Sequence, residues 1–336
     1  MRPRLLVLTT SYPRHDQDPA GHFVAQVNRA LETAGFACDV VRFDHRGPLA
    51  ALERGRLHEL VRPGWRFVRD ALGRHTAAHV GVVAHWLIPS AIVGHLTGLP
   101  VIGVAHGGDL RVLSRAPSLA RGVGRRIRGL VTVDPTRAPL LRCRHVLATP
   151  MGVDEGLVGL PPSIPGPRVL FLGRLVAIKG LDTLLAAAQA LPAFSFTIAG
   201  DGPERRLQRT APSNVTWLGA IPLGARRELL QSHHVVCVPS RAGEGLPSVA
   251  VEALAAGRHV VASAVGGLPS LLDAPQLVAP DRPSALAATL ERLVDVPSPA
   301  PRDDLAWSAV GPRIAAFVSQ CLRPPCGSGS ADTTVP

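Results

Sequence analysis

The sequence predicts an α/β protein with parallel βαβ units in two domains, and three observations support this. Short apolar runs rich in valine and leucine alternate with segments whose apolar residues recur at helical spacing, and such alternation is typical of parallel βαβ units. The 336 residues exceed one ordinary hydrophobic core and fit two domains of about 150 residues each. Proline and glycine crowd the segment 160–167, which has the composition of a linker between domains.

The first half contains five apolar runs that are typical of strands, together with a helical segment. Each run is short and bounded by loop residues, as expected for strands buried in a parallel sheet. Ligands of such sheets bind at the carboxyl ends of the strands. No Gly-x-Gly-x-x-Gly motif follows the first strand, which argues against a nicotinamide-dependent enzyme. The expected strands are Leu5–Thr9, Cys38–Phe43, Val80–His85, Val101–Ala105 and Leu130–Val133, and the helix is Phe23–Ala34.

The second half repeats this alternation and ends with an additional helix. Apolar residues at helical spacing continue from Asp303 to Cys321 and include Trp307. The low-complexity segment Cys326–Pro336 then has the composition of a disordered tail. The expected strands are 168–172, 194–199, 215–218, 235–238 and 259–263, and the expected helices are 181–191, one that begins at Glu204, one between Pro247 and Gly257, and 281–293.

The stretch Pro239–Gly257 carries the clearest chemical pattern. Pro247 suits the first turn of a helix and Gly257 the residue just past its end. Glu244 lies in the loop before this helix and Glu252 inside it, separated by seven residues. Carboxylates can accept hydrogen bonds from sugar hydroxyls, while the free N–H groups of a helix N-terminus attract phosphate. The stretch therefore indicates a sugar-nucleotide site.

Glu244 and Glu252 resemble the Glu-x7-Glu signature of glycosyltransferase family four, and other segments match further family motifs in the same order and spacing. The likeness covers nearly the whole chain before about residue 320 and is stronger in the second half. It implies the GT-B architecture, in which two Rossmann-like domains face each other across a cleft and a C-terminal helix crosses back to the first domain. The matching segments are Ala20–Val24, His85-Trp86, His106–Asp109, Pro150–Asp154, Phe171–Arg174, Lys179-Gly180, Ile198–Glu204 and Val261–Gly267.

On this basis the chain divides into four parts. Residues 1–160 form an acceptor domain, and residues 161–302 form the domain that binds the donor nucleotide-sugar. Residues 303–322 form the helix that crosses back, and residues 323–336 form a disordered tail. The resemblance implies a retaining hexosyltransferase that moves a hexose-like sugar from a nucleotide-sugar to an acceptor hydroxyl on a saccharide or lipid-linked acceptor. Synthesis of a cell-surface polysaccharide, glycolipid or glycoside is the expected context.

The resemblance also implies which residues form the site. Arg174 and Lys179 would hold the diphosphate in place of a metal ion, so no cofactor is expected, and the departing phosphate would help to accept the proton of the acceptor. Glu244 would contact the sugar hydroxyls, Glu252 the ribose and His106 the donor sugar. Lys179 is the only lysine among 36 basic residues. Its occurrence at the one position where the family motif has a lysine is hard to attribute to composition alone. Further donor contacts are expected from Gly21, Gly173, Gly245, Leu246, Pro247 and Ser248.

Several residues of the first half and one of the second also have structural interpretations. Gly21 can be a plain turn glycine, and isolated histidines such as His106 and the weaker candidate His85 are often structural. Trp217 can lie beside the nucleoside base, as in the family, or in the core. These alternatives stay open at the level of the sequence.

Two positions depart from the family pattern. Met151 stands where the family usually has asparagine, and Ser270 where it commonly has glutamate, so the polar contacts there are changed.

Three rival functions remain. A catalytically silent nucleotide-sugar-binding protein of the same fold would not need both cations and both glutamates. A sugar-phosphate isomerase on a related scaffold would lack the Glu-x7-Glu arrangement, and a nucleic-acid-binding protein would explain only the charge.

Positive charge is concentrated in the first half of the chain. Residues 1–160 contain 21 arginines against 12 acidic residues, whereas the remainder contains 15 basic against 13 acidic residues. An anionic membrane surface or a lipid-linked diphosphate acceptor fits this excess, while nucleic acid is not expected because aromatic residues do not interleave with the arginines. A solvated arginine-rich surface is an equally good interpretation. The densest basic run contributes Arg121, Arg125, Arg126 and Arg128.

Cysteine usage and hydropathy favour a reduced, cytoplasmic protein. The five cysteines are scattered without a Cys-x-x-Cys pair, so neither a disulfide framework nor a zinc site is expected. No secretory signal and no apolar run of ~20 residues is present, which leaves peripheral attachment to the inner face of the membrane as the expected form of any membrane contact. The pair Asp16 and Asp18 is more typical of a solvated turn than of a metal site.

Overall fold

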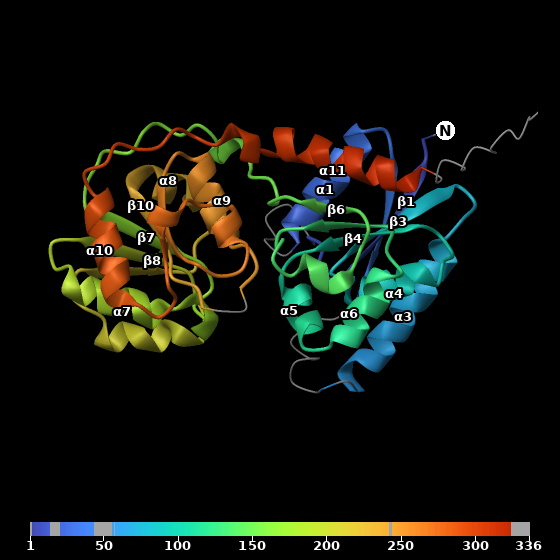
Figure 1. Ribbon diagram of the computed structural model, residues 1–336, viewed down its shortest axis with the longest axis horizontal. Coiled ribbons are helices and arrows are strands. Elements are labelled where there is room, and N and C mark those ends of the chain that lie inside the picture. Colours follow the sequence, from blue (N-terminus) through green and yellow to red (C-terminus); the bar gives the residue numbers. More distant parts are fainter. Residues whose placement is uncertain (1, 14–20, 44–55, 57, 242–243, 324–336) are drawn as a thin grey trace, which may run out of the picture.

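The computed structural model describes residues 2–13, 21–43, 56, 58–241 and 244–323. Within these ranges the chain forms two six-stranded parallel sheets, each flanked by helices (Figure 1). The predicted α/β class with two Rossmann-like domains is therefore confirmed. The chain passes from one sheet to the other between residues 149 and 167, and the exact limits of the two domains stay a prediction.

The first domain contains β1 (Arg4–Thr9), α1 (His22–Thr33), β2 (Ala37–Arg42), α3 (His58–Arg74), β3 (His79–His85), α4 (Leu87–His95), β4 (Val101–Ala105), α5 (Gly108–Ser114), α6 (Pro117–Gly124), β5 (Gly129–Thr132) and β6 (Val146–Ala148). Its strand order is β2-β1-β3-β4-β5-β6. Leu6 and Leu8 of β1 belong to the core under α3–α6, whereas Leu5 and Val7 belong to the core under α1. Because both faces of the strand are buried, its sequence is a continuous apolar run.

The second domain contains β7 (Arg168–Leu172), α7 (Leu181–Ala190), β8 (Ser195–Ala199), β9 (Val215–Gly219), α8 (Ala225–Ser232), β10 (Val235–Val238), α9 (Ser248–Ala255), β11 (His259–Ser263), β12 (Leu277–Val278) and α10 (Pro283–Leu293). Its strand order is β12-β11-β10-β7-β8-β9. Val236 and Val238 of β10 pack with α9 on one face, and Val235 and Cys237 pack with α7 and α10 on the other. The loop that contains Glu244 directly follows this buried strand.

The last helix, α11 (Trp307–Leu322), returns from the second domain and lies against α1 of the first (Figure 1). Val310, Ile314 and Val318 are fully buried in the first domain's core. A side chain on Gly311 would begin 2.9 Å from Cβ of Ala30, so glycine allows the two helices to approach closely. The predicted crossing-back helix is confirmed.

One expected helix takes a different form. Pro203–Thr210 is a 3₁₀ helix, although an ordinary helix beginning at Glu204 was expected. The backbone N–H of Glu204 donates to the carbonyl of Leu175 at 2.9 Å, so a tertiary contact fixes the first turn of this segment. Local sequence does not contain that constraint.

The described cysteines and helices can be compared with the remaining expectations. Cys38, Cys143, Cys237 and Cys321 are free thiols, and Cys326 lies outside the described residues. None of the helices in the described ranges is both long and apolar enough to cross a membrane.

Candidate active site

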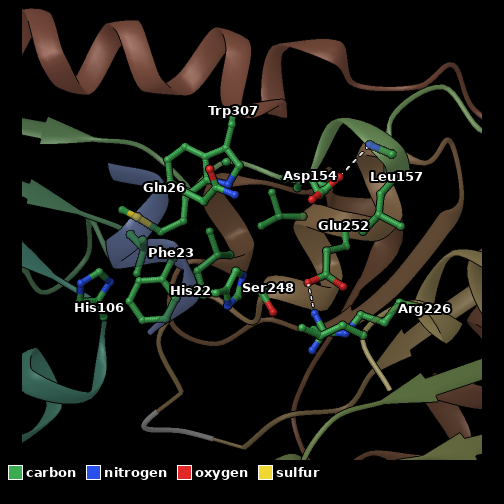
Figure 2. A pocket seen from close by; sticks show the side chains of 18 of the residues that line it. His22, Phe23, Gln26, His106, Asp154, Leu157, Arg226, Ser248, Glu252 and Trp307 are labelled. Carbon is green, nitrogen blue, oxygen red and sulfur yellow. Dashed lines mark hydrogen bonds and ion pairs between the residues drawn. The ribbon is translucent and has the colours of Figure 1, made fainter. Parts of the chain in front are cut away.

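A cavity of about 510 Å³ lies between the two domains (Figure 2). Helix α1 contributes His22, Phe23 and Gln26 to one wall, and the loops after β3 and β4 contribute Trp86 and His106. The opposite wall comes from α8 and α9. The remaining lining residues are Val133, Met151, Gly152, Val153, Asp154, Gly156, Leu157, Leu223, Gly224, Arg226, Arg227, Leu246, Ser248, Val251, Glu252 and Trp307.

Lys179 and Glu244 form an ion pair, with Nζ 3.0 Å from Oε2. Gly180 makes this possible: its φ is 65°, and a Cβ there would lie 2.0 Å from the carbonyl oxygen of Pro239. Only glycine allows the loop of Lys179 to pack so tightly against the loop that follows β10. Arg241 adds a second link, because it donates to the carbonyl of Ala177 at 2.8 Å. The two loops are therefore fixed to each other at the position of the ion pair.

Glu252 is the buried carboxylate of the second-domain wall. Its side chain is held by Arg226, whose guanidinium lies 3.0 Å from Oε1 (Figure 2). The other oxygen, Oε2, is buried and has no hydrogen-bond partner among the described residues. Leaving a buried carboxylate oxygen unpaired is costly, so Oε2 is suited to accept a hydrogen bond from a hydroxyl group of a ligand in the cavity.

Helix α9 begins at this wall. Pro247 precedes it in an extended conformation, and no side chain of the described residues caps its first turn. The N–H of Ala250 donates to the carbonyl of Pro247, and the N–H groups before it are suited to bind an anion. Gly257 follows the helix with a φ of 68°. The predicted position of Gly257 just past the helix is thus confirmed, whereas Pro247 lies one residue before the first turn in which it was expected.

His106 lies among aromatic rings on the first-domain wall. Its ring centroid is 4.4 Å from that of Phe23 and 4.8 Å from that of Trp86. Nε2 of His106 lies 3.1 Å from Nδ1 of the fully buried His85. Burial lowers the pKa of His85 to about 3, and burial together with the adjacent His85 holds the pKa of His106 well below its usual value. Both imidazoles are therefore neutral at pH 7.

Asp109 connects the two loops that carry these histidines. Its carboxylate accepts a hydrogen bond from the backbone N–H of His106 and another from that of Leu87, each at 3.1 Å. Burial raises the pKa of Asp109 to about 6. Asp109, the last residue of the His-Gly-Gly-Asp motif, therefore holds the backbone of His106 in position.

The domains touch next to this motif. A Cβ on Gly107 would lie 2.7 Å from Cα of Gly245, so the loop after His106 lies directly against the loop after Glu244. Arg137 strengthens the contact by donating to the carbonyl of Glu244 at 3.2 Å while it pairs with the buried Asp134. The residues predicted for the donor sugar thus lie on facing loops.

The predicted site residues are only partly gathered in the cavity. His106, Leu246, Ser248 and Glu252 line it, whereas Lys179 and Glu244 pair beside it. Arg174 is exposed at the end of β7. The remaining predicted donor-binding residues that the structure describes outside the lining set are Gly21, Gly173, Gly245 and Pro247.

One of these glycines, Gly21, has a clear backbone reason. Gly21 has a φ of 72°, and a Cβ there would lie 2.5 Å from the carbonyl oxygen of Ser11, which favours the turn interpretation. Gly173 lies next to Lys179, because a Cβ there would lie 4.0 Å from Cε, an ordinary van der Waals distance.

The basic run of the first domain contains arginines with local contacts. Arg126 donates to the carbonyl of Gly122, and Arg128 donates to the carbonyls of Cys321 and Arg323 at the end of α11. Cations are favourable at helix C-termini. Arg121 donates to Ser118, and Arg125 is exposed. Their role toward a membrane or acceptor stays a prediction.

The remaining sequence expectations can also be placed. Trp217 packs against the second domain's core, Met151 lines the cavity, and Ser270 donates to the carbonyl of Gly267 at 2.7 Å. Asp16 and Asp18 lie outside the described residues, within which no cluster of three or more potential metal ligands occurs.

Sequence reasoning missed the arginines and rings that build the walls. Arg226 carries no motif of its own. Phe23 lies in the matched segment Ala20–Val24 and Arg241 in the stretch Pro239–Gly257, but their contacts with His106 and Ala177 join residues distant in sequence. Trp86 offered a signal, because it follows His85 directly in a matched segment. Its φ of 59° is rare for a bulky residue, and such strain tends to occur at functional sites.

Comparisons with known proteins identify relatives of this chain. Residues 166–295 match the family described as Glycosyl transferases group 1. The chain is 33% identical over 187 residues to a 2-deoxystreptamine glucosyltransferase of Streptomyces kanamyceticus, which covers 50% of this chain and 44% of that protein. It spans about half the length of the curated relatives it matches first.

Solved structures show the same fold over nearly the whole chain. Sucrose-phosphate synthase from Thermosynechococcus elongatus aligns with a TM-score of 0.71 and 21% identity over 96% of this chain and 95% of that one. Anabaena HepE, solved in complex with UDP-glucose, aligns with a TM-score of 0.64 and 19% identity over 95% of each chain. Together with the family match of residues 166–295, these likenesses show that the chain has a GT-B fold and is similar to glycosyltransferases of family four.

Proposed function

We propose that the protein is a retaining glycosyltransferase that moves a hexose-like sugar from a nucleotide-sugar to an acceptor hydroxyl. One observation carries the proposal: Glu252, with one unpaired buried oxygen, lines the same cavity as the neutral His106 of the opposite domain. A ligand that spans the cavity would contact the carboxylate of Glu252 at one end and the neutral imidazole of His106, as a hydrogen-bonding group, at the other.

The second domain supplies the groups suited to the donor. The unpaired oxygen of Glu252 would accept a ribose hydroxyl, and the uncapped first turn of α9 would bind phosphate. Lys179 would leave Glu244 and turn toward the diphosphate as negative charge develops there, which frees Glu244 to contact the sugar. Arg174, exposed at the end of β7, would approach the same diphosphate.

Similar proteins suggest the donor class. One relative is named a glucosyltransferase, and HepE was solved with UDP-glucose. A UDP-hexose is therefore the first donor to test. The acceptor would enter along the first-domain wall, where aromatic rings offer flat apolar surfaces of the kind on which sugars stack.

A donor screen tests the proposal. The protein is incubated with UDP-, GDP-, ADP- and dTDP-hexoses, with and without saccharide and lipid-linked acceptors, and products are identified by mass spectrometry. The anomeric configuration of any product is read by NMR. Tight donor binding with no release of nucleoside diphosphate would instead favour a silent binding protein.

Metal independence is part of the same proposal. Because Lys179 and Arg174 would balance the charge of the diphosphate, turnover is expected to survive excess chelator. Activity that is lost with chelator and restored only by magnesium or manganese would contradict this. The cytoplasmic location expected from the sequence likewise stays a prediction.

A further inference from the structure

Helix α3 exposes a row of large apolar side chains. Trp65 is 72% exposed, Val61 67% and Leu72 44%. Their spacing of four and seven residues places them on one side of the helix. The side that carries Phe67 and Ala71 is buried in the core, so this helix already has its packing partner. An exposed tryptophan between two exposed aliphatic residues marks a surface suited to further apolar contact.

A row of arginines runs beside the apolar row. Arg62, Arg66 and Arg69 are all exposed and follow the apolar residues by one position or one turn. The helix also contains Glu59 and Asp70, which pair with Arg56 and Arg69 respectively. Helices with tryptophan and aliphatic residues on one side and arginine next to them lie at membrane interfaces, where the long basic side chains reach anionic headgroups.

The neighbouring helices extend this surface. Helix α4 packs on α3, and α6 packs on α4, on the same face of the first sheet (Figure 1). Ile92 and Leu96 at α4 and Leu119 on α6 are exposed as well, and α6 carries Arg121 of the basic run. We propose that the outer face of α3, anchored by Trp65 and Arg62, Arg66 and Arg69, docks the protein on an anionic lipid bilayer.

Vesicle sedimentation tests the docking face. The full chain is pelleted with phosphatidylglycerol-containing or pure phosphatidylcholine vesicles. Trp65→Ser should weaken binding to the anionic vesicles about tenfold or more, and Arg62→Gln with Arg66→Gln roughly 30-fold at low salt. Matched controls in the second domain are Ile164→Ser, which removes a side chain that is 73% exposed, and Arg205→Gln with Arg209→Gln. Both controls should bind like the unmodified protein.

Several outcomes would overturn this proposal. Equal binding to both kinds of vesicle, no binding to either, or equal losses in the α3 variants and their controls would each do so. Light scattering that shows a dimer converted to a monomer by Trp65→Ser, without vesicle binding, would assign the face to a second copy of the chain instead.

A second inference concerns His85 and rests on a separate observation. The rings of His85 and His106 are 9° from parallel, and their centroids are 5.4 Å apart. That separation is close to the N···N distance of 3.1 Å plus the radii of the two rings. The imidazoles are therefore nearly coplanar, edge to edge, and joined by an almost linear hydrogen bond.

Burial selects one of two proton arrangements for this bond. Nε2 of His85 is buried and has no hydrogen-bond partner in the described part of the chain. If His106 donated, neutral His85 would carry its proton on that nitrogen, as a buried unpaired donor. If His85 donates from Nδ1, the same nitrogen is only an unpaired acceptor, which is the more tolerable defect. We infer that His85 is a positioning residue that holds the proton of His106 on Nδ1, available to a ligand in the cavity.

Nitrogen NMR tests the tautomer without requiring activity. Long-range ¹H–¹⁵N spectra of the unmodified protein should show His106 protonated on Nδ1, and His85→Phe should shift it toward a mixture. His85→Asn keeps a donor at the Nδ1 position and should restore the Nδ1 tautomer. A spectrum with the proton on Nε2 of His106 in the unmodified protein would overturn the inference.

The catalytic consequence rests on the proposed function and is measured separately. His85→Phe should lower turnover about tenfold with little change in donor KM, and His85→Asn should recover most of it. The expected spectra combined with no transfer by any form would count against the proposed function and leave the tautomer intact. Unchanged turnover in a folded His85→Phe enzyme would show that the tautomer has no catalytic role.

Discussion

The two walls of the cavity hold their polar groups in opposite ways. On the second-domain side the groups are charged and paired, Arg226 with Glu252 in the wall itself and Lys179 with Glu244 outside the lining residues. On the first-domain side His85 and His106 are neutral and enclosed by rings. Paired charges can be exchanged for the charges of a phosphate, whereas neutral imidazoles suit hydroxyl groups. This difference supports the proposed placement of the donor phosphates on the second domain and of hydroxyl contacts on the first.

The largest expected effect is at Lys179. If its ammonium stabilises the departing diphosphate, Lys179→Ala should lower turnover by roughly 10²–10³-fold. Lys179→Arg should recover only part, because a planar guanidinium differs from a point charge on a flexible stem. Single-turnover transfer and melting temperature are measured for both.

Removal of Lys179 also leaves Glu244 without its partner, which is controlled by combining Lys179→Ala with Glu244→Gln. The double variant should regain melting temperature but not activity. A stable Lys179→Ala enzyme with normal turnover would show that the ion pair is only structural.

The contact between the walls is tested at Gly107. Gly107 has a φ of 90° and touches Gly245, whereas Gly98 has a φ of 74° and open space around it. Both alanine variants bear the strain of positive φ, on the order of 1 kcal/mol. Gly107→Ala should in addition push apart the loops of His106 and Glu244, and so lose more stability in urea unfolding and most of the transfer activity. Equal behaviour of the two variants would mean that the contact does not position the walls.

The neutral histidines predict how stability depends on pH. Between the unfolded pKa of 6.5 and the folded pKa of about 3, unfolded His85 binds a proton that the folded form does not. The free energy of unfolding therefore decreases as the pH is lowered, by up to about 1.4 kcal/mol per pH unit. His106 acts in the same direction. Asp109 opposes them, because its pKa rises from 3.8 to about 6 on folding. The loss should begin below pH 6.5 and be partly offset between pH 6 and pH 3.8.

Urea unfolding across this pH range measures the effect. His85→Phe should flatten the dependence, whereas His145→Phe, at an exposed position, should leave it unchanged. A His85→Phe protein with the same slope as the unmodified protein would argue that His85 is charged inside the fold.

The smallest effect is expected at Arg226. Arg226→Met removes the partner of Glu252, whose orientation then loosens, so donor KM should rise about tenfold while turnover changes little. Arg227→Met is the matched control, since Arg227 lines the same cavity but bonds to the carbonyl of Gly156. A fall in turnover at constant KM would place Arg226 at the reacting group instead.

Local sequence patterns predicted the fold class and several backbone features of the candidate site. Apolar runs such as 235–238 predicted buried strands because both faces of a parallel strand are covered. Pro247 and Gly257 predicted the ends of α9, since backbone geometry restricts those positions to few residue types. The ion pair between Lys179 and Glu244 joins two segments that the motif resemblance had already singled out.

Which distant side chains meet follows from the folded arrangement and not from any local pattern. The bond between His85 and His106 and the pairing of Arg226 with Glu252 depend on how strands and helices are placed in space, and no periodicity records that. The orientation of α3 is subject to the same limit. The spacing of its apolar residues does not show whether a row of them faces the core or the solvent, so only the packing of the helix places Trp65 on the surface. Local patterns fix elements because they act within a few residues, whereas contacts between elements depend on the whole fold.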